Sequence, residues 1–130
     1  MNGKVLVVDD DAEARIIVSD LLARLEVNHT LVSSAGECIS RLVADPREFD
    51  MVLMDIHMPN LSGADACVWI KDSEVDPPKG IPIIAMTGDA TFFDETALTL
   101  FGMQGVLQKP ISLENLHNTL IKHNRSLRLN

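Results

Sequence analysis

The sequence predicts an α/β domain in which helices cover both faces of a parallel β-sheet. Five short apolar runs are spread along the 130 residues, and the segments between them repeat apolar residues at helical spacing. Alternation of this kind is typical of parallel strands joined by right-handed helical crossovers. Because 130 residues is the length of one ordinary domain, residues 1–130 are expected to form a single unit.

The five apolar runs are expected to form the strands of the sheet. Most of them consist of Val, Ile, Leu and Met without an interrupting charge, which is the pattern of strands buried on both faces. In the second run, Asn28 and His29 dilute this pattern. We predict strands over residues 4–8, 30–33, 51–54, 81–86 and 105–108.

The segment after the first strand predicts a helix with one apolar face. Ile17, Leu21 and Leu25 recur every four residues, which places them on one side of an α-helix. Either Asp10 or Asp11 can cap the N-terminus of this helix, because a short side-chain oxygen accepts a hydrogen bond from the first free N–H groups.

Four further helices are expected from similar signals. The second ends before Pro46, because a residue preceding proline disfavours the helical conformation. The fourth ends at Gly102, which suits a C-cap, and the fifth follows Ser112, which suits an N-cap. The predicted ranges are about 35–45, 63–73 and 91–101, and the segment after residue 112.

Side chains that can bind a cation or a phosphate follow four of the five runs. In an open α/β sheet, ligands bind at the carboxyl ends of the strands. Side chains at the ends of different strands are therefore expected to meet at one site. They are the aspartates at 9–11, Asp55, Thr87 and Lys109.

A cluster of carboxylates at this edge indicates a Mg²⁺ site. Two carboxylates about 4 Å apart repel by roughly 4 kcal/mol at an effective dielectric near 20, and a divalent cation offsets that repulsion. All-oxygen ligation favours Mg²⁺ over Zn²⁺, and Mg²⁺ also coordinates phosphate oxygens. Asp55 can then act as a nucleophile that forms an aspartyl phosphate. Lys109 and Thr87 can contact the phosphoryl oxygens.

Four motifs in order carry a family resemblance. They are Val-Val-Asp-Asp-Asp at 7–11, Leu-Met-Asp-Ile-His-Met-Pro at 53–59, Met-Thr-Gly at 86–88 and Lys-Pro at 109–110. Together they resemble the CheY-like receiver domains of two-component response regulators, over nearly the whole chain. The resemblance implies a doubly wound, flavodoxin-like sheet of five strands in the order 2-1-3-4-5, flanked by five helices.

The resemblance also implies a role for each site residue. Asp55 would be the phosphoacceptor, and Asp10 and Asp55 would bind Mg²⁺ directly, with Asp9 acting through water. The backbone carbonyl of His57 would complete the protein ligands. Thr87 and Lys109 would be the switch hydroxyl and the lysine of the family.

The phosphoryl donor implied by the family is a phosphohistidine on a histidine kinase or on a histidine phosphotransfer domain. The chain would take up one phosphoryl group and lose it by hydrolysis, rather than turn over as an ordinary enzyme. Many receivers carry Tyr or Phe three residues before the lysine, where this chain has Val106. The loop that follows Asp55 and the Lys-Pro-Ile segment resemble those of receivers within hybrid sensor kinases.

Composition restricts the environment and the partners. The net charge of −8 argues against nucleic-acid binding, which needs a basic surface. No apolar run has the length of a signal peptide or of a membrane span, so a soluble, cytoplasmic domain without membrane contact is expected. Cys38 and Cys67 lie in helical patterns and are expected to be buried, reduced thiols.

Two other functions compete with phosphoacceptance. A phosphatase of the haloacid dehalogenase type also forms an aspartyl phosphate. It needs a second Asp two residues after the nucleophile, where this chain has His57. A receiver-shaped docking module that is never phosphorylated would be expected to have a broken site. Here Asp55, Thr87 and Lys109 are all present.

Overall fold

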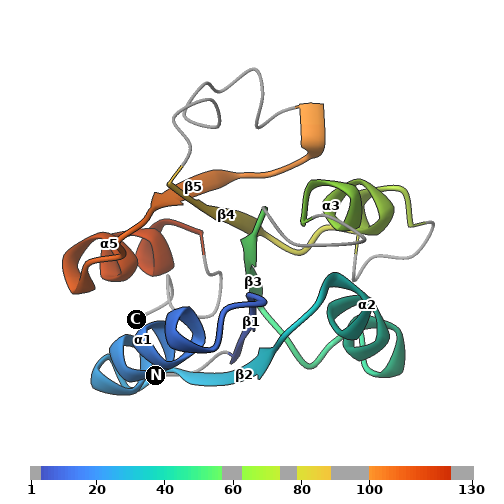
Figure 1. The fold of residues 1–130 in the computed structure, drawn as a ribbon. Helices are drawn as coiled ribbons and strands as arrows, with labels where there is room; N and C mark the ends of the chain where they lie inside the picture. The colour runs from blue at the N-terminus through green and yellow to red at the C-terminus, as the bar shows by residue number, and fades with distance from the viewer. Residues whose placement is uncertain (1–3, 57–62, 74–78, 89–99, 124–130) are drawn as a thin grey trace.

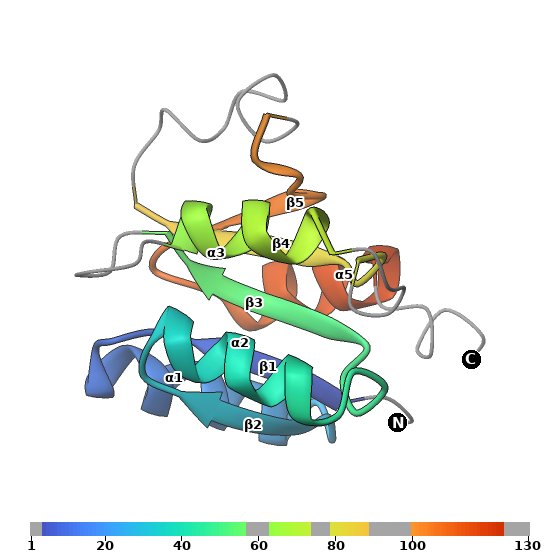
Figure 2. The same cartoon turned by 90° about the vertical axis from the view of Figure 1, so that its right-hand side faces the viewer.

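The structure is a computed structural model that describes residues 4–56, 63–73, 79–88 and 100–123. Its centre is a parallel five-stranded sheet of order β2-β1-β3-β4-β5. α1 and α5 cover one face of the sheet, and α2 and α3 cover the other (Figures 1 and 2). The predicted doubly wound fold and its strand order are confirmed.

The strands lie close to their predicted ranges, with shifts of one or two residues at five strand ends. β2 begins at Asn28 rather than at residue 30, because Lys4 pairs with Asn28 and the β1 ladder continues along this polar edge. β3 and β4 include Asp55 and Thr87, and β4 starts only after Pro82, which has no N–H to donate. The strands are β1 Lys4–Val8, β2 Asn28–Val32, β3 Met51–Asp55, β4 Ile83–Thr87 and β5 Gly105–Gln108.

Helix α1 (Ala12–Arg24) is capped by Asp11 and not by Asp10. The Asp11 carboxylate accepts a hydrogen bond of 3.0 Å from the N–H of Glu13. Of the predicted apolar stripe, Leu21 and Leu25 pack against the core as expected, and Leu25 is also the C-cap. Ile17 is 54% exposed, so its predicted place on the core-facing side of the helix is wrong.

The described residues contain three further helices, α2 (Ala35–Ala44), α3 (Gly63–Lys71) and α5 (Leu113–His123). α2 and α3 end one and two residues earlier than predicted, and Asp45 is the C-cap of α2. Ser112 lies before α5, as expected, and accepts from Asn115 N–H at 3.1 Å. Most of the predicted fourth helix lies outside the described residues, although residues 100 and 101 are helical.

Alternate residues of the three central strands β1, β3 and β4 face two separate cores. On β1, Val5 and Val7 pack with α1 and α5, whereas Leu6 and Val8 pack with α2 and α3. Because every central strand is covered on both faces, the near-continuous apolar runs are explained. No helix in the described part of the chain is long and apolar enough to cross a membrane.

Both cysteines lie in the core on the α2/α3 face and are free thiols, as predicted. Burial raises the pKa of Cys38 to about 12 and that of Cys67 to about 11. At neutral pH both therefore pack as uncharged side chains.

Candidate functional site

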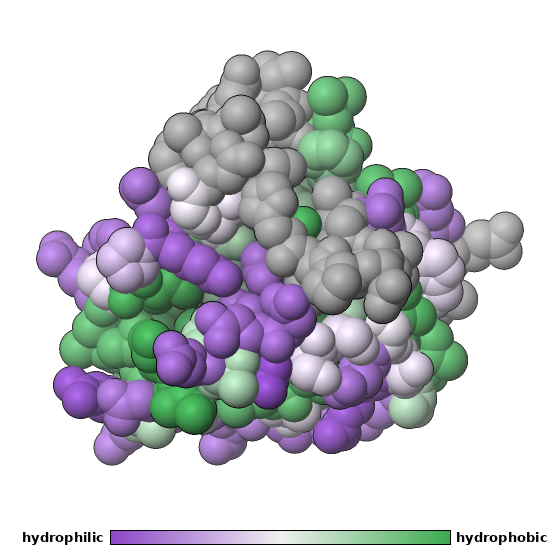
Figure 3. Space-filling model, viewed as in Figure 1, coloured by the Kyte–Doolittle hydropathy of each residue, from purple (hydrophilic) through white to green (hydrophobic). Residues whose placement is uncertain are grey.

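The carboxyl edge of the sheet carries the predicted site residues. Figure 1 looks onto this edge, and Figure 3, in the same view, shows hydrophilic residues gathered over its middle. The ladder continues past the strand ends, since Asp9 N–H donates to Val32 C=O at 3.2 Å and Lys109 N–H donates to Thr87 C=O at 2.9 Å. Asp55 is paired with Met86, the residue before Thr87. The backbone thus brings residues 9, 55, 87 and 109 to one edge.

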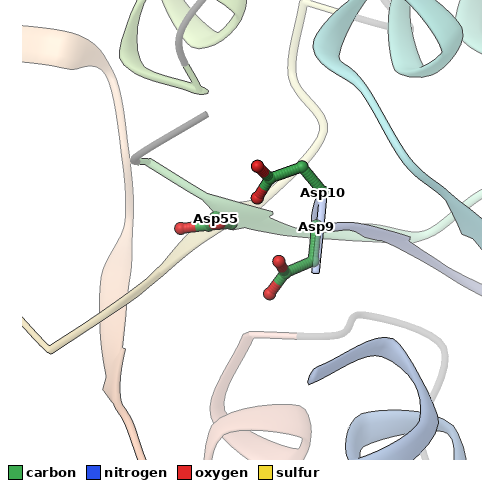
Figure 4. A group of neighbouring side chains, drawn as sticks. All are labelled: Asp9, Asp10 and Asp55. Carbon is green, nitrogen blue, oxygen red and sulfur yellow. The ribbon is translucent and has the colours of Figure 1, made fainter. Parts of the chain in front are cut away.

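Three carboxylates form an acidic cluster here. One oxygen each of Asp9, Asp10 and Asp55 lies within 4.8 Å of the others. Asp9 and Asp10 come from the end of β1 and Asp55 from the end of the adjacent β3 (Figure 4). Asp9 is fully buried and Asp55 is 5% exposed, whereas Asp10 is exposed to solvent. The donor set is all oxygen and open on the Asp10 side, which fits Mg²⁺ with several retained waters.

The buried Asp9 carboxylate is held from two sides. Its Oδ1 accepts the backbone N–H of Asp11 at 3.0 Å, and its Oδ2 accepts from Nζ of Lys109 at 2.9 Å. These contacts satisfy both oxygens of a charge that would otherwise be expensive to bury.

Lys109 connects the two buried carboxylates. Its Nζ lies 3.7 Å from Oδ1 of Asp55 as well as 2.9 Å from Asp9. Burial lowers the pKa of Lys109, but the hydrogen bond to Asp9 and the charges of Asp55, Asp9 and Asp11 outweigh burial and raise it above its ordinary value. The ammonium is therefore charged at all physiological pH values and supplies positive charge beside Asp55.

The other two predicted residues are less fully described. Thr87 is the last residue of β4 and is 1% exposed, one step along the edge from the partner of Asp55. His57 lies outside the described residues. The structure thus brings Asp9, Asp10, Asp55 and Lys109 together through side-chain contacts and short separations, and brings Thr87 to the same edge through strand register.

One residue near the site was missed by the sequence analysis. Nη1 of Arg15 donates to the backbone carbonyl of Asp9 at 2.7 Å. A signal was present, because a cation near the N-terminus of a helix opposes the helix dipole and usually needs a local reason. Arg15 stands near the start of α1 behind three aspartates.

Val106 stands where many receivers carry an aromatic ring. It is partly buried and packs against the core on the α2/α3 face. Beside it, β5 and α5 border an open groove of about 350 Å³. The lining of this groove combines two apolar residues with four polar ones: Val106, Leu107, Gln108, Asn115, Asn118 and Thr119.

Comparison with known families agrees with this arrangement. The model of the response regulator receiver domain matches residues 5–121, which is most of the chain. The chain belongs to the response regulator receiver family. Such domains act in two-component signalling.

Curated relatives place similar domains within longer proteins. The transcription factor SKN7 of Saccharomyces cerevisiae is 36% identical over 119 residues, and the histidine kinase BarA of Escherichia coli K12 is 33% identical over 119 residues. Each match covers 92% of this chain. The chain spans only 18% and 12% of these two relatives.

Solved structures show the same fold. Chemotaxis protein CheY4 of Vibrio cholerae matches with a TM-score of 0.83 at 24% identity, over 95% of this chain and 99% of that one. The receiver domain of Ssk1 of Saccharomyces cerevisiae, crystallised with the histidine phosphotransfer protein Ypd1, gives a match with a TM-score of 0.81 at 22% identity. That match covers 95% of this chain and 89% of the other.

Proposed function

We propose that the chain is the phosphoacceptor domain of a two-component phosphorelay, in which Asp55 takes a phosphoryl group from a phosphohistidine in a Mg²⁺-dependent reaction. One observation carries the proposal. Asp55 shares an acidic cluster with Asp9 and Asp10 and has the Lys109 ammonium 3.7 Å from its Oδ1. A nucleophile, a cation site and a fixed positive charge are the parts that phosphoryl transfer to a carboxylate needs.

The residues that would hold Mg²⁺ are Asp10 and Asp55 directly and Asp9 through water, with the carbonyl of His57 as a further ligand by analogy with the family. The acidic cluster supports this set, because its oxygens are close enough to share one ion. Bound Mg²⁺ would neutralise negative charge on the phosphoryl oxygens and hold them toward Asp55.

The chain's own residues would then carry out the transfer. A carboxylate oxygen of Asp55 forms the new bond to phosphorus as the P–N bond of the phosphohistidine breaks, and the electron pair of that bond leaves with the imidazole nitrogen. Lys109 and Thr87 bind two phosphoryl oxygens, through the ammonium and the hydroxyl. Because Asp55 is almost completely buried, few waters compete with it for phosphorus.

A protein donor suits the surface beside the site. On α1, Ile16 is 67% exposed and Ile17 is 54% exposed, and a hydrophobic area lies over this helix in Figure 3. Ile17 also borders a small apolar pocket of about 90 Å³ with Pro110 and Ile111, next to Lys109. An exposed apolar surface adjoining the site favours a folded donor, either a histidine kinase or a histidine phosphotransfer domain.

Phosphorylation would change the site by charge. It adds about −1.5 to −2 charges and three acceptor oxygens beside Lys109 and Thr87. A shift of a two-state equilibrium from mostly off to mostly on needs about 5.5 kcal/mol of differential interaction. With Val106 in place of an aromatic ring, a smaller rearrangement of β5 would report the signal, or the domain would relay phosphate onward.

In this role the domain would work in the cytoplasm, without contact to a membrane or to nucleic acid. The net charge of −8 supports the latter, because a phosphate backbone is repelled by such a surface.

The test is phosphoryl labelling of Asp55→Asn, using radiolabelled acetyl phosphate or a phosphohistidine protein with Mg²⁺. We expect no label on this variant, because the amide is a poor nucleophile. Asp20→Asn is the matched control, since Asp20 is an exposed carboxylate on α1 that pairs with Arg24. It should label like the wild type. Stoichiometric labelling of Asp55→Asn would refute the assignment.

The same assay separates the two competing functions. A haloacid dehalogenase-type phosphatase would release inorganic phosphate continuously from small phosphate esters, and we expect no such turnover. A docking module would give no phosphoryl labelling that depends on Asp55, and its Mg²⁺ binding would be the same in the wild type and in Asp55→Asn. Calorimetric titration of Mg²⁺ into the wild type and into Asp55→Asn gives an independent reading of the cation site.

A further inference from the structure

The direction of the Asp10 side chain is set by hydrogen bonds to the backbone on either side of it. In the described part of the chain it has no hydrogen-bond or ion-pair partner, although it lies in the acidic cluster. The peptide units on either side of its Cα are both held. The carbonyl of Asp9, in the preceding unit, accepts from Arg15 at 2.7 Å. The N–H of Asp11, in the following unit, donates to Asp9 Oδ1 at 3.0 Å.

Holding both peptide units fixes the two backbone dihedrals of Asp10. The direction of its Cα–Cβ bond, and hence the region that its carboxylate can reach, follows from those dihedrals. The second contact comes from a carboxylate that is itself fully buried and held by Lys109. The first depends on one half-buried side chain, Arg15, whose guanidinium is a strong, charged donor.

We propose that Arg15 is a positioning residue for the cation site, which acts by clamping the Asp9–Asp10 peptide so that Asp10 is preset as a ligand. The inference rests on the proposed function, in that Asp10 is taken to bind Mg²⁺. Arg15 itself touches neither the cation nor the phosphoryl group. It acts only through the backbone carbonyl of Asp9.

The sign of the effect distinguishes this role from simple electrostatics. Arg15 carries a positive charge near a cation site, so removal of that charge alone would strengthen Mg²⁺ binding. Loss of the clamp would weaken Mg²⁺ binding, because Asp10 must then be ordered when the ion binds. Groups that orient metal ligands typically change metal affinity by about 10–100-fold when removed. We expect the loss of the clamp to outweigh the loss of the positive charge, so that Arg15→Met binds Mg²⁺ about tenfold more weakly than the wild type.

The experiment compares three variants by calorimetric or NMR titration with MgCl₂. Arg15→Met removes charge and donor but keeps most of the apolar stem. Arg15→Lys keeps charge with a single donor nitrogen and should recover part of the lost affinity. Arg24→Met is the matched control, because it removes an arginine whose side chain is 65% exposed at the far end of the same helix. Its Mg²⁺ affinity should equal or slightly exceed that of the wild type.

A fourth protein tests the route through Asp10. In an Asp10→Ala background the clamp has no side-chain ligand to orient, so adding Arg15→Met should cause no further loss of Mg²⁺ affinity. Circular dichroism and thermal melts without Mg²⁺ confirm that each variant is folded. If Arg15 has only a structural role, Arg15→Met should have a lower melting temperature than the wild type but the same Mg²⁺ dissociation constant.

Each result decides one question. Unchanged or tighter Mg²⁺ binding by folded Arg15→Met overturns the inference while the proposed function stands. If Arg15→Met does not fold, Arg15→Lys decides in the same way, since weakened binding supports the clamp and wild-type binding overturns it. Failure of the wild type to bind Mg²⁺ at millimolar concentration contradicts the proposed function itself.

Discussion

The ammonium of Lys109 is hydrogen-bonded to the carboxylate of Asp9 at 2.9 Å, across 100 positions of the sequence. Lys109 therefore already neutralises part of the acidic cluster before any ligand binds. Its distance of 3.7 Å to Asp55 is longer, so Asp9 is its main partner. A cation and Lys109 must then share the same group of carboxylates.

This shared cluster predicts that Lys109→Met binds Mg²⁺ more tightly than the wild type. Two positive groups within a few ångströms of one another repel by a few kcal/mol at an effective dielectric near 20, and screening reduces that further. A gain of about three- to tenfold in Mg²⁺ affinity is expected, measured by calorimetry at fixed ionic strength. Phosphoryl labelling from acetyl phosphate should fall in the same variant, because the ammonium no longer binds the phosphoryl oxygens.

The control for this prediction is Lys79→Met. Lys79 lies before β4, at the opposite edge of the sheet, and its loss changes the net charge equally. Mg²⁺ binding and labelling should both stay near the wild-type level. Weaker Mg²⁺ binding in Lys109→Met would show that the ammonium organises the cluster rather than competes within it.

Two glycine substitutions are predicted to change the free energy of unfolding in opposite directions. Gly102 has φ of +75°, and a Cβ there would lie 2.7 Å from Cγ of Lys71, whose Nζ is anchored on the carbonyls of Lys79 and Ile81. Gly102→Ala should lower the free energy of unfolding by about 1–3 kcal/mol. Gly36 lies within α2, where an added Cβ would meet only Ser34 Oγ, at an ordinary contact distance of 3.9 Å, so Gly36→Ala should raise the free energy of unfolding by about 0.4–1 kcal/mol. Urea unfolding measures both, and equal signs would contradict the structure.

Val106→Tyr is predicted to fold and to act as a reporter. Val106 is only partly buried and lies on the edge strand β5, so a larger side chain can extend toward solvent and the free energy of unfolding should change by less than about 1 kcal/mol. The chain has no other tyrosine, so near-ultraviolet difference spectra report this ring against the single tryptophan. Acetyl phosphate with Mg²⁺ should change the tyrosine signal in Val106→Tyr but not in Val106→Tyr/Asp55→Asn. A loss of several kcal/mol would mean that β5 cannot accept a ring at this position.

The raised pKa values of the two buried thiols predict that the fold loses stability at alkaline pH. Their pKa values in the fold, about 12 and about 11, exceed the value of 9.0 expected after unfolding. Below pH 9 the thiols are protonated in both states and have no effect. Between pH 9 and 11 only the unfolded state releases these protons, so the free energy of unfolding falls by up to about 1.4 kcal/mol per pH unit for each thiol.

The double variant Cys38→Ala/Cys67→Ala isolates this effect. Lys109 and other groups titrate in the same range, but they are present in both proteins and cancel when the two pH slopes are compared. The wild type should lose stability more steeply than the double variant between pH 9 and 11. Parallel slopes would show that the thiols ionise as easily in the fold as in the unfolded chain.

Much of the fold and the meeting of the site residues followed from local pattern. Runs such as 51–54 are apolar because both faces of the central strands are covered, and the residue that ends each run must lie at the carboxyl edge. β2 was placed too late because it is an edge strand. Asn28 can face solvent and still pair with Lys4, so hydrophobicity does not mark its start.

Contacts between distant side chains did not follow from pattern. The sequence placed Lys109 at the site but did not indicate that Asp9 would be its main partner, because that depends on side-chain rotamers. Asp10 and Asp11 are equally good caps by residue type. In the structure Asp11 is the cap, and its own N–H donates to Asp9 Oδ1. The position of Arg15 near a helix N-terminus signals that it has a local partner, but the sequence does not show that this partner is the backbone carbonyl of Asp9.

The alternation of side chains along the strands means that a phosphoryl group bound at the proposed site would act on both faces of the sheet. Asp55 and Lys109 follow the residues that face α1 and α5, such as Leu53 and Leu107, whereas Thr87 follows Ala85, which faces α2 and α3. A phosphoryl group bound by both Thr87 and Lys109 would draw β4 and β5 together from opposite faces of the sheet. Such a force would change the twist between these two paired strands, and the change would reach the helices on both faces.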